Sequence, residues 1–205
     1  MYKIMKYLTP IMYYKLIILN NLQCTYRRHV KGKLDFIDKT PRPAILFIKK
    51  HFKNKLISGL ELGVQIGNNS ISILKELNIH TLYLVDSWNN YVEKEISNKT
   101  YRQNYLLVLK KFQYNNKVKI IKGFSETIAK DFDDNILDFI YIDANHNYNF
   151  VYQDLDLWSK KVKINGIISG HDVFNHNDVL LAVKDWCIKN KYKFYINPPD
   201  WYFIK

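Results

Sequence analysis

The chain is poor in cysteine, which argues against a disulfide framework or a structural zinc site. Its 205 residues include two cysteines, Cys24 and Cys187, which lie far apart in the sequence. They form no Cys-x-x-Cys or Cys/His spacing of the kind that binds structural zinc. So few cysteines also fit a reducing compartment, and we expect a cytoplasmic protein.

The sequence also lacks an apolar stretch long enough to cross a membrane. Its first 22 residues are largely apolar but carry Lys3, Lys6 and Lys15. A spanning helix needs about 20 apolar residues, and a signal peptide needs an unbroken apolar stretch with a small-residue cleavage site. We therefore expect no transmembrane segment. An amphipathic helix that packs on the domain, or less favourably contacts a membrane surface, is the better interpretation.

Acidic residues are few compared with basic ones. Nineteen Asp and Glu oppose 31 Lys and Arg, which gives a net charge of +12. This balance can attract nucleic acid, anionic lipid or acidic substrates, but it does not define a fold. The lysines are scattered, and the densest basic cluster contains Arg27 and Arg28. A solvated surface is the simpler interpretation. A footprint for RNA or a phosphorylated substrate is the alternative, so nucleic acid is not the favoured partner.

Glycine is scarce, at seven residues, and several glycines follow apolar runs that look like strands. Four runs end in a glycine turn or an acid: Leu60–Gly67, Leu82–Asp86, Phe139–Asp143 and Gly166–Asp172. In an open α/β sheet, ligands bind outside the carboxyl ends of the strands. We therefore expect one crevice to collect Gly63, Gly67, Asp86, Asp143, His171 and Asp172.

Strand-like and helix-like segments alternate from Leu56 onward, which favours a mostly parallel α/β sheet. Residues 1–55 lack this alternation and are expected to form a helical N-terminal cap or extension, and residues 56–205 the main domain. The expected strands are 57–62, 81–86, 117–122, 136–143, 166–169, 192–196 and 201–204. The expected helices are 69–77, 97–112, 125–132, 149–161 and 178–190. The fold class is thus α/β, with a seven-stranded sheet that ends in an antiparallel hairpin turning at Asn197–Asp200.

The loop Glu61-x-Gly63-x-x-x-Gly67 ends the first strand and opens a helix. Glycine lets the backbone turn sharply and approach a ligand, and the helix N-terminus offers free N–H groups. Gln65 stands in place of the central glycine of the dinucleotide fingerprint, and no phosphate-binding Gly-Lys-Ser/Thr follows. A ligand without phosphates is therefore favoured over NAD or ATP. Asp86, at the end of the second strand, could accept both ribose hydroxyls of a nucleoside.

These segments resemble class I S-adenosylmethionine-dependent methyltransferases. They are most similar to the sugar and antibiotic O-methyltransferase branch (methyltransferase family 24-like). The resemblance covers about Leu56 to the C-terminus and rests on Glu61–Ser70, Val85–Trp88, Lys122–Ser125, Leu137–Tyr148 with Asp154-Leu155, and Asn165–Asp172. It implies a Rossmann-like fold, S-adenosylmethionine as cofactor, and O-methylation of a small molecule or glycan.

The resemblance also implies roles for single residues. Glu61, Gly63 and Gly67 would hold the methionine part of the cofactor, and Asp86 its ribose. The remaining cofactor-binding residues would be Ser87, Trp88, Gly123, Phe124, Ser125 and Asp143, of which Gly123, Phe124 and Ser125 would flank the adenine. Gln65 and Asn165 depart from residues that are frequent in the family, and neither departure removes the cofactor pocket.

Methyl transfer to a hydroxyl needs alignment with the sulfonium and removal of a proton. Asp143, His171 and Asp172 are expected to converge at two strand ends, where they would suit Mg²⁺ or Mn²⁺. Such an ion lowers the pKa of a bound hydroxyl. The alternative is that His146 or His171 acts as a general base without metal. For His146, a loop histidine bonded to backbone is an equally weighted interpretation. The candidate catalytic residues are therefore Asp143, His146, His171 and Asp172.

Two other functions stay open. An RNA or protein methyltransferase would use the basic surface and bind RNA in a salt-sensitive way. A non-catalytic binding module would bind the cofactor without turnover. The N-terminal cap is expected to cover the substrate side or to mediate a homodimer. Asp154 and Trp158 fit a helix face that packs in the core.

Overall fold

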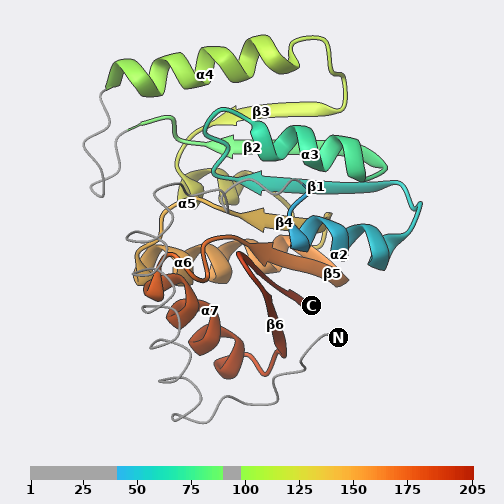
Figure 1. The fold of residues 1–205 in the computed structure, drawn as a ribbon, viewed down its shortest axis with the longest axis vertical. Coiled ribbons are helices and arrows are strands. Elements are labelled where there is room, and N and C mark those ends of the chain that lie inside the picture. Colours follow the sequence, from blue (N-terminus) through green and yellow to red (C-terminus); the bar gives the residue numbers. More distant parts are fainter. Residues whose placement is uncertain (1–40, 90–97) are drawn as a thin grey trace, which may run out of the picture.

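The computed structural model describes residues 41–89 and 98–205 (Figure 1). The expectations for the first 40 residues, including the amphipathic start, Cys24 and the Arg27-Arg28 cluster, lie outside the described residues. Within the described ranges, no helix combines the length and the apolar character needed to cross a bilayer.

Seven strands form one sheet in the order β3-β2-β1-β4-β5-β7-β6. Their bounds are β1 (Ile57–Leu62), β2 (Ile79–Asp86), β3 (Val118–Lys122), β4 (Leu137–Ile142), β5 (Val162–Gly170), β6 (Phe194–Asn197) and β7 (Asp200–Ile204). The first five strands pair in parallel, and β7 runs antiparallel to both β5 and β6. The predicted α/β class, the mostly parallel sheet and the terminal hairpin are confirmed.

Helices cover both faces of the sheet (Figure 1). One face carries α2 (Pro43–Phe52), α3 (Asn68–Glu76) and α4 (Asn98–Phe112). The other carries α5 (Ser125–Ile128), α6 (Tyr148–Trp158) and α7 (Asn177–Lys189), with the 3₁₀ turns Ala129–Asp131 and Ser159–Lys161. The central strand β4 is buried along its whole length. Phe139 and Tyr141 face the first layer of helices and Ile140 and Ile142 the second, as the two-residue period of a strand requires.

Most element bounds differ from expectation by a few residues at one or both ends, and two elements differ in a way that has a structural reason. Strand β5 begins at Val162 rather than at Gly166, because Val162 already pairs with Leu137 before a shift in register. Asn165 adopts a φ of 64° at this irregularity, and the polar residues around it hide the strand from a hydrophobic pattern. The expected helix over 125–132 is a single α turn that continues as 3₁₀.

Helix α2 packs Ala44, Ile45 and Ile48 into the core. Pro43 occupies its first turn, where the missing N–H is unpaired in any helix. The Ala44 N–H donates at 2.8 Å to the carboxylate of Asp200, at the start of β7. The helix start is therefore held by a residue from the far end of the chain.

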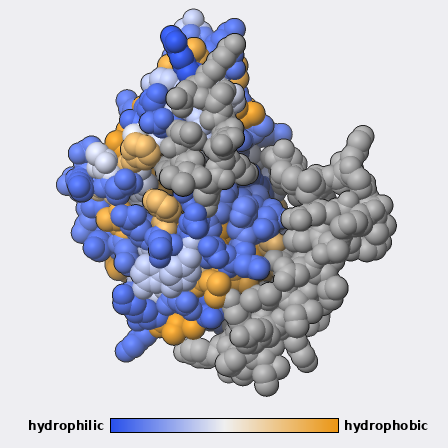
Figure 2. Space-filling view, turned by 90° about the vertical axis from the view of Figure 1, so that its left-hand side faces the viewer, coloured by the Kyte–Doolittle hydropathy of each residue, from blue (hydrophilic) through white to orange (hydrophobic). Residues whose placement is uncertain are grey.

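Figure 2 views the molecule from the side on which the parallel strands end. The described surface on this side is mainly hydrophilic, and its hydrophobic residues lie in separate small patches. The candidate site opens at this end of the sheet.

Candidate active site

A cavity of about 470 Å³ lies at the carboxyl ends of β1, β2, β4 and β5, where the strand order reverses. This is the position expected for a ligand in an open α/β sheet, and the volume suits a small molecule. Its lining includes these predicted residues: Glu61, Gly63, Asp86, Ser87, Trp88, Gly123, Ser125, Asp143, His146, His171 and Asp172. Gly67 and Phe124 are not in the lining. Gly67 is the N-cap of α3, and Phe124 is 37% exposed.

The glycine loop passes very close to the end of β4. Gly63 has a φ of 87°, and a Cβ atom added to it would lie 2.0 Å from the carbonyl oxygen of Asp143. Both the left-handed backbone and the close approach require glycine. The loop and Asp143 are therefore held against each other at the centre of the site.

Asp86 is tied to the glycine loop by backbone donors. Its Oδ2 atom accepts from the N–H groups of Val64 and Gln65, each at 2.8 Å, and its Oδ1 from that of Trp88 at 2.7 Å. Burial raises the pKa of Asp86, and these donors oppose that shift. A carboxylate has about four acceptor positions, so Asp86 retains capacity for a ligand hydroxyl.

Glu61 is 1% exposed and is held by the first turn of α3. It accepts a hydrogen bond from Asn69 Nδ2 at 3.0 Å and a short one from Ser70 Oγ. Burial raises its pKa to about 7 despite these donors. Bringing a cationic ligand group to this carboxyl would favour its ionised form.

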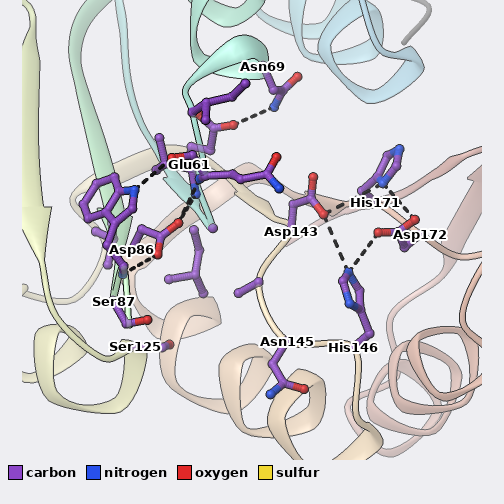
Figure 3. Close-up of a pocket in the computed structure, with 18 of the residues that line it drawn as sticks. Glu61, Asn69, Asp86, Ser87, Ser125, Asp143, Asn145, His146, His171 and Asp172 are labelled. Atoms are coloured by element: carbon purple, nitrogen blue, oxygen red, sulfur yellow. Dashed lines mark hydrogen bonds and ion pairs between the residues drawn. The ribbon is translucent and has the colours of Figure 1, made fainter. Parts of the chain in front are cut away.

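Four predicted catalytic residues meet at the opposite end of the cavity from Asp86 (Figure 3). His146 Nε2 lies 2.9 Å from Asp172 Oδ2 and 3.9 Å from Asp143 Oδ1. His171 Nδ1 lies 3.1 Å from Asp172 Oδ1 and 3.8 Å from Asp143 Oδ1. Two imidazoles thus face two carboxylates across the ends of β4 and β5.

Asp172 organises this group. It has a φ of 62°, an unusual conformation for a residue with a side chain, and it also accepts from Asn175 Nδ2 at 2.7 Å. Burial disfavours its ionised form, yet hydrogen bonds from His146 and His171 hold its pKa well below the usual range. Burial lowers the pKa of His146, but hydrogen bonds to Asp143 and Asp172 raise it to about 9.

Two overlapping sets of side chains could hold a metal ion. The ligand atoms of Asp143, His171 and Asp172 lie within 4.8 Å of one another, and so do those of His146, Asp172 and His176. The rings of His146 and His176 stack at 4.1 Å between centroids. Carboxylate oxygens and imidazole nitrogens suit Mn²⁺ and heavier divalent ions, and oxygen ligands suit Mg²⁺.

Arg42, which no sequence pattern indicated as a site residue, lines the cavity from the start of α2. Its Nη1 donates to Asp143 Oδ2 at 2.7 Å and to the hydroxyl oxygen of Tyr141 at 3.0 Å. Tyr141 in turn donates to Asp200 at 2.8 Å. The Thr40–Pro43 segment indicates only a helix break. No local signal reveals a partner 101 residues away.

Asp154 was expected in the core, and it is buried at 5% exposure. It also makes a specific contact, because the hydroxyl of the lining residue Ser125 donates a short hydrogen bond to it. Trp158 Nε1 donates to the same hydroxyl at 2.8 Å. The indole and the carboxyl together fix the orientation of Ser125.

The part of the chain that forms most of the cavity matches a known family. Residues 60–173, more than half of the chain, match the family model of a methyltransferase domain. No curated protein matches the sequence.

Similar solved structures include three methyltransferases. A protein assigned as a caffeoyl-CoA O-methyltransferase from Staphylococcus aureus has a TM-score of 0.60 at 19% identity, over 95% of this chain and 99% of that one. The O-methyltransferase NovP has a TM-score of 0.59 at 17% identity, over 79% of each chain. An O-methyltransferase from Bacillus cereus, solved in complex with SAH, has a TM-score of 0.59 at 12% identity, over 96% and 92%. At these identities the likeness concerns the fold.

Proposed function

The chain belongs to the methyltransferase-domain family, and from that premise we propose that it transfers the methyl group of S-adenosylmethionine to a hydroxyl of a small molecule or glycan. Family membership implies the methyl donor. The acceptor class is supported by the arrangement of Asp143, His146, His171 and Asp172 at one end of the cavity.

The cavity fits a nucleoside-containing donor. Asp86 stands over β2 with acceptor capacity for ribose hydroxyls, beside Ser87 and Gly123. Glu61 provides a buried carboxyl over β1. Between the two, the glycine loop brings the backbone into the cavity without side-chain bulk at Gly63. When bound, S-adenosylmethionine supplies an electrophilic methyl group on a sulfonium.

The chain's own part in the reaction is to position the acceptor and receive its proton. We assign proton acceptance to the His146–Asp172 pair or to His171, each in its neutral form and each paired with the same carboxylate. The pKa of His146 is raised to about 9, so this role requires turnover to increase as the pH rises toward that value. Asp172 holds both imidazoles in place. A divalent ion would be held by Asp143, His171 and Asp172 and would lower the pKa of the acceptor hydroxyl.

Calorimetric titration with S-adenosylmethionine and, separately, with NAD tests the cofactor assignment. We expect micromolar binding of S-adenosylmethionine and none of NAD. No binding of S-adenosylmethionine, with or without Mg²⁺, would contradict the proposal and favour a structural role for the glycine loop.

An acceptor screen that begins with sugars tests the reaction. With an accepted substrate, we expect Asp172→Asn to abolish formation of S-adenosylhomocysteine while cofactor binding persists. Asp131→Asn, which alters an exposed carboxylate outside the cavity lining, is the matched control and should retain full activity. Cofactor binding without turnover on any acceptor, unchanged by Asp172→Asn, would favour a non-catalytic binding module.

Chelation with EDTA tests whether a divalent metal ion takes part in the reaction. If an ion participates, EDTA suppresses turnover, and added Mg²⁺ or Mn²⁺ restores it. Activity that is insensitive to EDTA would assign proton acceptance to the histidines alone.

A further inference from the structure

The cavity is rich in carboxylates and poor in cations. Glu61, Asp86, Asp143 and Asp172 all line it. Within the described ranges, Arg42 is the single lysine or arginine in the lining. A ligand that carries its own carboxylate would be repelled by such a cavity unless a cation received it. The imidazoles of His146 and His171 are paired with Asp172. Among the cationic groups in the lining, Arg42 is the one whose charge acts on Glu61.

The sheet register places Arg42 beside Glu61. Tyr141 is the parallel-strand partner of Glu61, so the two side chains project from the same face of the sheet. Arg42 lies against Tyr141, with its guanidinium 5.5 Å from the ring centroid and Nη1 3.0 Å from the hydroxyl. The positive charge of Arg42 also acts on Glu61, whose pKa it lowers. A carboxyl and a guanidinium therefore stand side by side over β1 and β4.

The guanidinium of Arg42 is held in place and still has hydrogen-bond donors for a ligand. A guanidinium has five N–H donors in a fixed plane. The recorded contacts of Arg42 within the described ranges engage Nη1 alone, with Asp143 and Tyr141. Asp200 stabilises this arrangement, because its carboxylate accepts hydrogen bonds from the hydroxyl of Tyr141 and from the N–H of Ala44. The donors on Nη2 and Nε can therefore bind a ligand, and the guanidinium is already oriented before the ligand arrives.

We propose that Arg42 binds the α-carboxylate of the methionine moiety of the cofactor, while Glu61 receives its α-ammonium group. The assignment rests on the proposed function, since it takes S-adenosylmethionine as the ligand. Opposite charges on the protein then match the two ends of the amino-acid zwitterion. An arginine is suited to this task because its planar fork matches the geometry of a carboxylate.

Three adenosine ligands that differ in their charged groups isolate the contribution of the contact between Arg42 and the carboxylate. S-adenosylhomocysteine carries both the carboxylate and the ammonium group. Its decarboxylated analogue, 5′-deoxy-5′-(3-aminopropylthio)adenosine, keeps only the ammonium group, and 5′-methylthioadenosine has neither. We would measure the Kd of each by calorimetry for the wild type, Arg42→Gln, Arg42→Lys and the control Arg102→Gln. Arg102 is an exposed arginine outside the cavity lining, so its replacement removes the same charge elsewhere.

We expect Arg42→Gln to weaken binding of S-adenosylhomocysteine about tenfold to a hundredfold, the usual effect of losing a hydrogen bond to a charged group. Binding of the two ligands without a carboxylate should be unchanged, which also shows that the variant is folded. Arg42→Lys should restore part of the affinity, and Arg102→Gln should bind all three ligands like the wild type.

Two results would overturn the assignment while leaving the proposed function intact. If Arg42→Gln weakens the binding of all three ligands equally, Arg42 acts only by positioning Asp143 and the glycine loop. If it weakens none, Arg42 does not contact the cofactor. A wild-type protein that binds none of the three ligands overturns the proposed function, and this inference with it.

Discussion

Buried carboxyl groups dominate the chemistry of this protein at the level of single residues. Burial raises the pKa of Glu61 and of Asp154 to about 7, and that of Asp200 to about 6. Asp172 is less deeply buried, and its two histidine partners shift its pKa in the opposite direction. The balance between desolvation and nearby donors thus differs from one carboxyl to the next.

Asp86→Ala should weaken cofactor affinity substantially, by about tenfold or more. The substitution removes the acceptor for the ribose hydroxyls and also releases the N–H groups of Val64 and Gln65. Calorimetry with S-adenosylmethionine measures the loss, and a thermal melt separates it from unfolding. Unchanged affinity would refute the assignment of the nucleoside end of the cavity to Asp86.

The burial of Asp154 predicts that stability falls as pH rises. Its pKa is raised to about 7 in the folded chain and is about 3.9 when unfolded. Between these values the folded state keeps a proton that the unfolded state has lost, so the free energy of unfolding decreases with increasing pH. The contribution over this interval is on the order of 4 kcal/mol.

Asp154→Asn tests this expectation, because an amide can still accept from Ser125 but does not titrate. Urea unfolding at about pH 5 and about pH 8 should show a smaller loss of stability in the variant than in the wild type. Asp131→Asn is again the control and should behave like the wild type. Equal losses in Asp154→Asn and the wild type would contradict the predicted linkage.

At the level of elements, the site depends on how closely strand ends and helix starts approach. Gly63→Ala would force a side chain into a left-handed backbone and against the carbonyl of Asp143. We expect a loss of about 1–3 kcal/mol or more in stability, together with weaker cofactor binding. Gly123→Ala is the matched comparison. Its Cβ would meet the flexible end of Ile128 at 2.6 Å, and no positive φ is recorded for Gly123.

Thermal melts and calorimetry on both glycine variants distinguish the two positions. Gly63→Ala should be the more damaging in both measurements. If the two variants are equally stable and bind equally well, the close approach of the loop to β4 is not required.

At the level of the whole molecule, the net charge of +12 raises the question of whether the protein binds RNA. The carboxylates in the cavity give its interior a different character from a lysine-rich exterior. We expect RNA to bind weakly at low salt and to dissociate as salt approaches physiological concentration, because released counterions drive such binding. Fluorescence anisotropy with labelled RNA across a salt series measures this. Retained affinity at physiological salt, together with methyl transfer to RNA, would favour the RNA methyltransferase alternative.

Much of the sheet and part of the site follow from patterns that neighbouring residues carry. The strand ends at Leu62, Asp86 and Ile142 were predicted within a residue, because an apolar run that stops at a glycine or an acid depends on local sequence alone. The convergence of Asp143 with His171 and Asp172 could also be foreseen, since parallel strands end at the same edge.

Contacts across the fold could not be foreseen. Arg42 meets Tyr141 and Asp143 because α2 packs beside α3 and over β5 and β7, next to β4. Asp200 contacts both Tyr141 and the start of α2 because β7 inserts beside β5. These partners lie 59 to 156 residues apart in the chain. Their meeting depends on the strand order and on the layer that each helix joins, which are properties of the packed chain and leave no trace in local spacing.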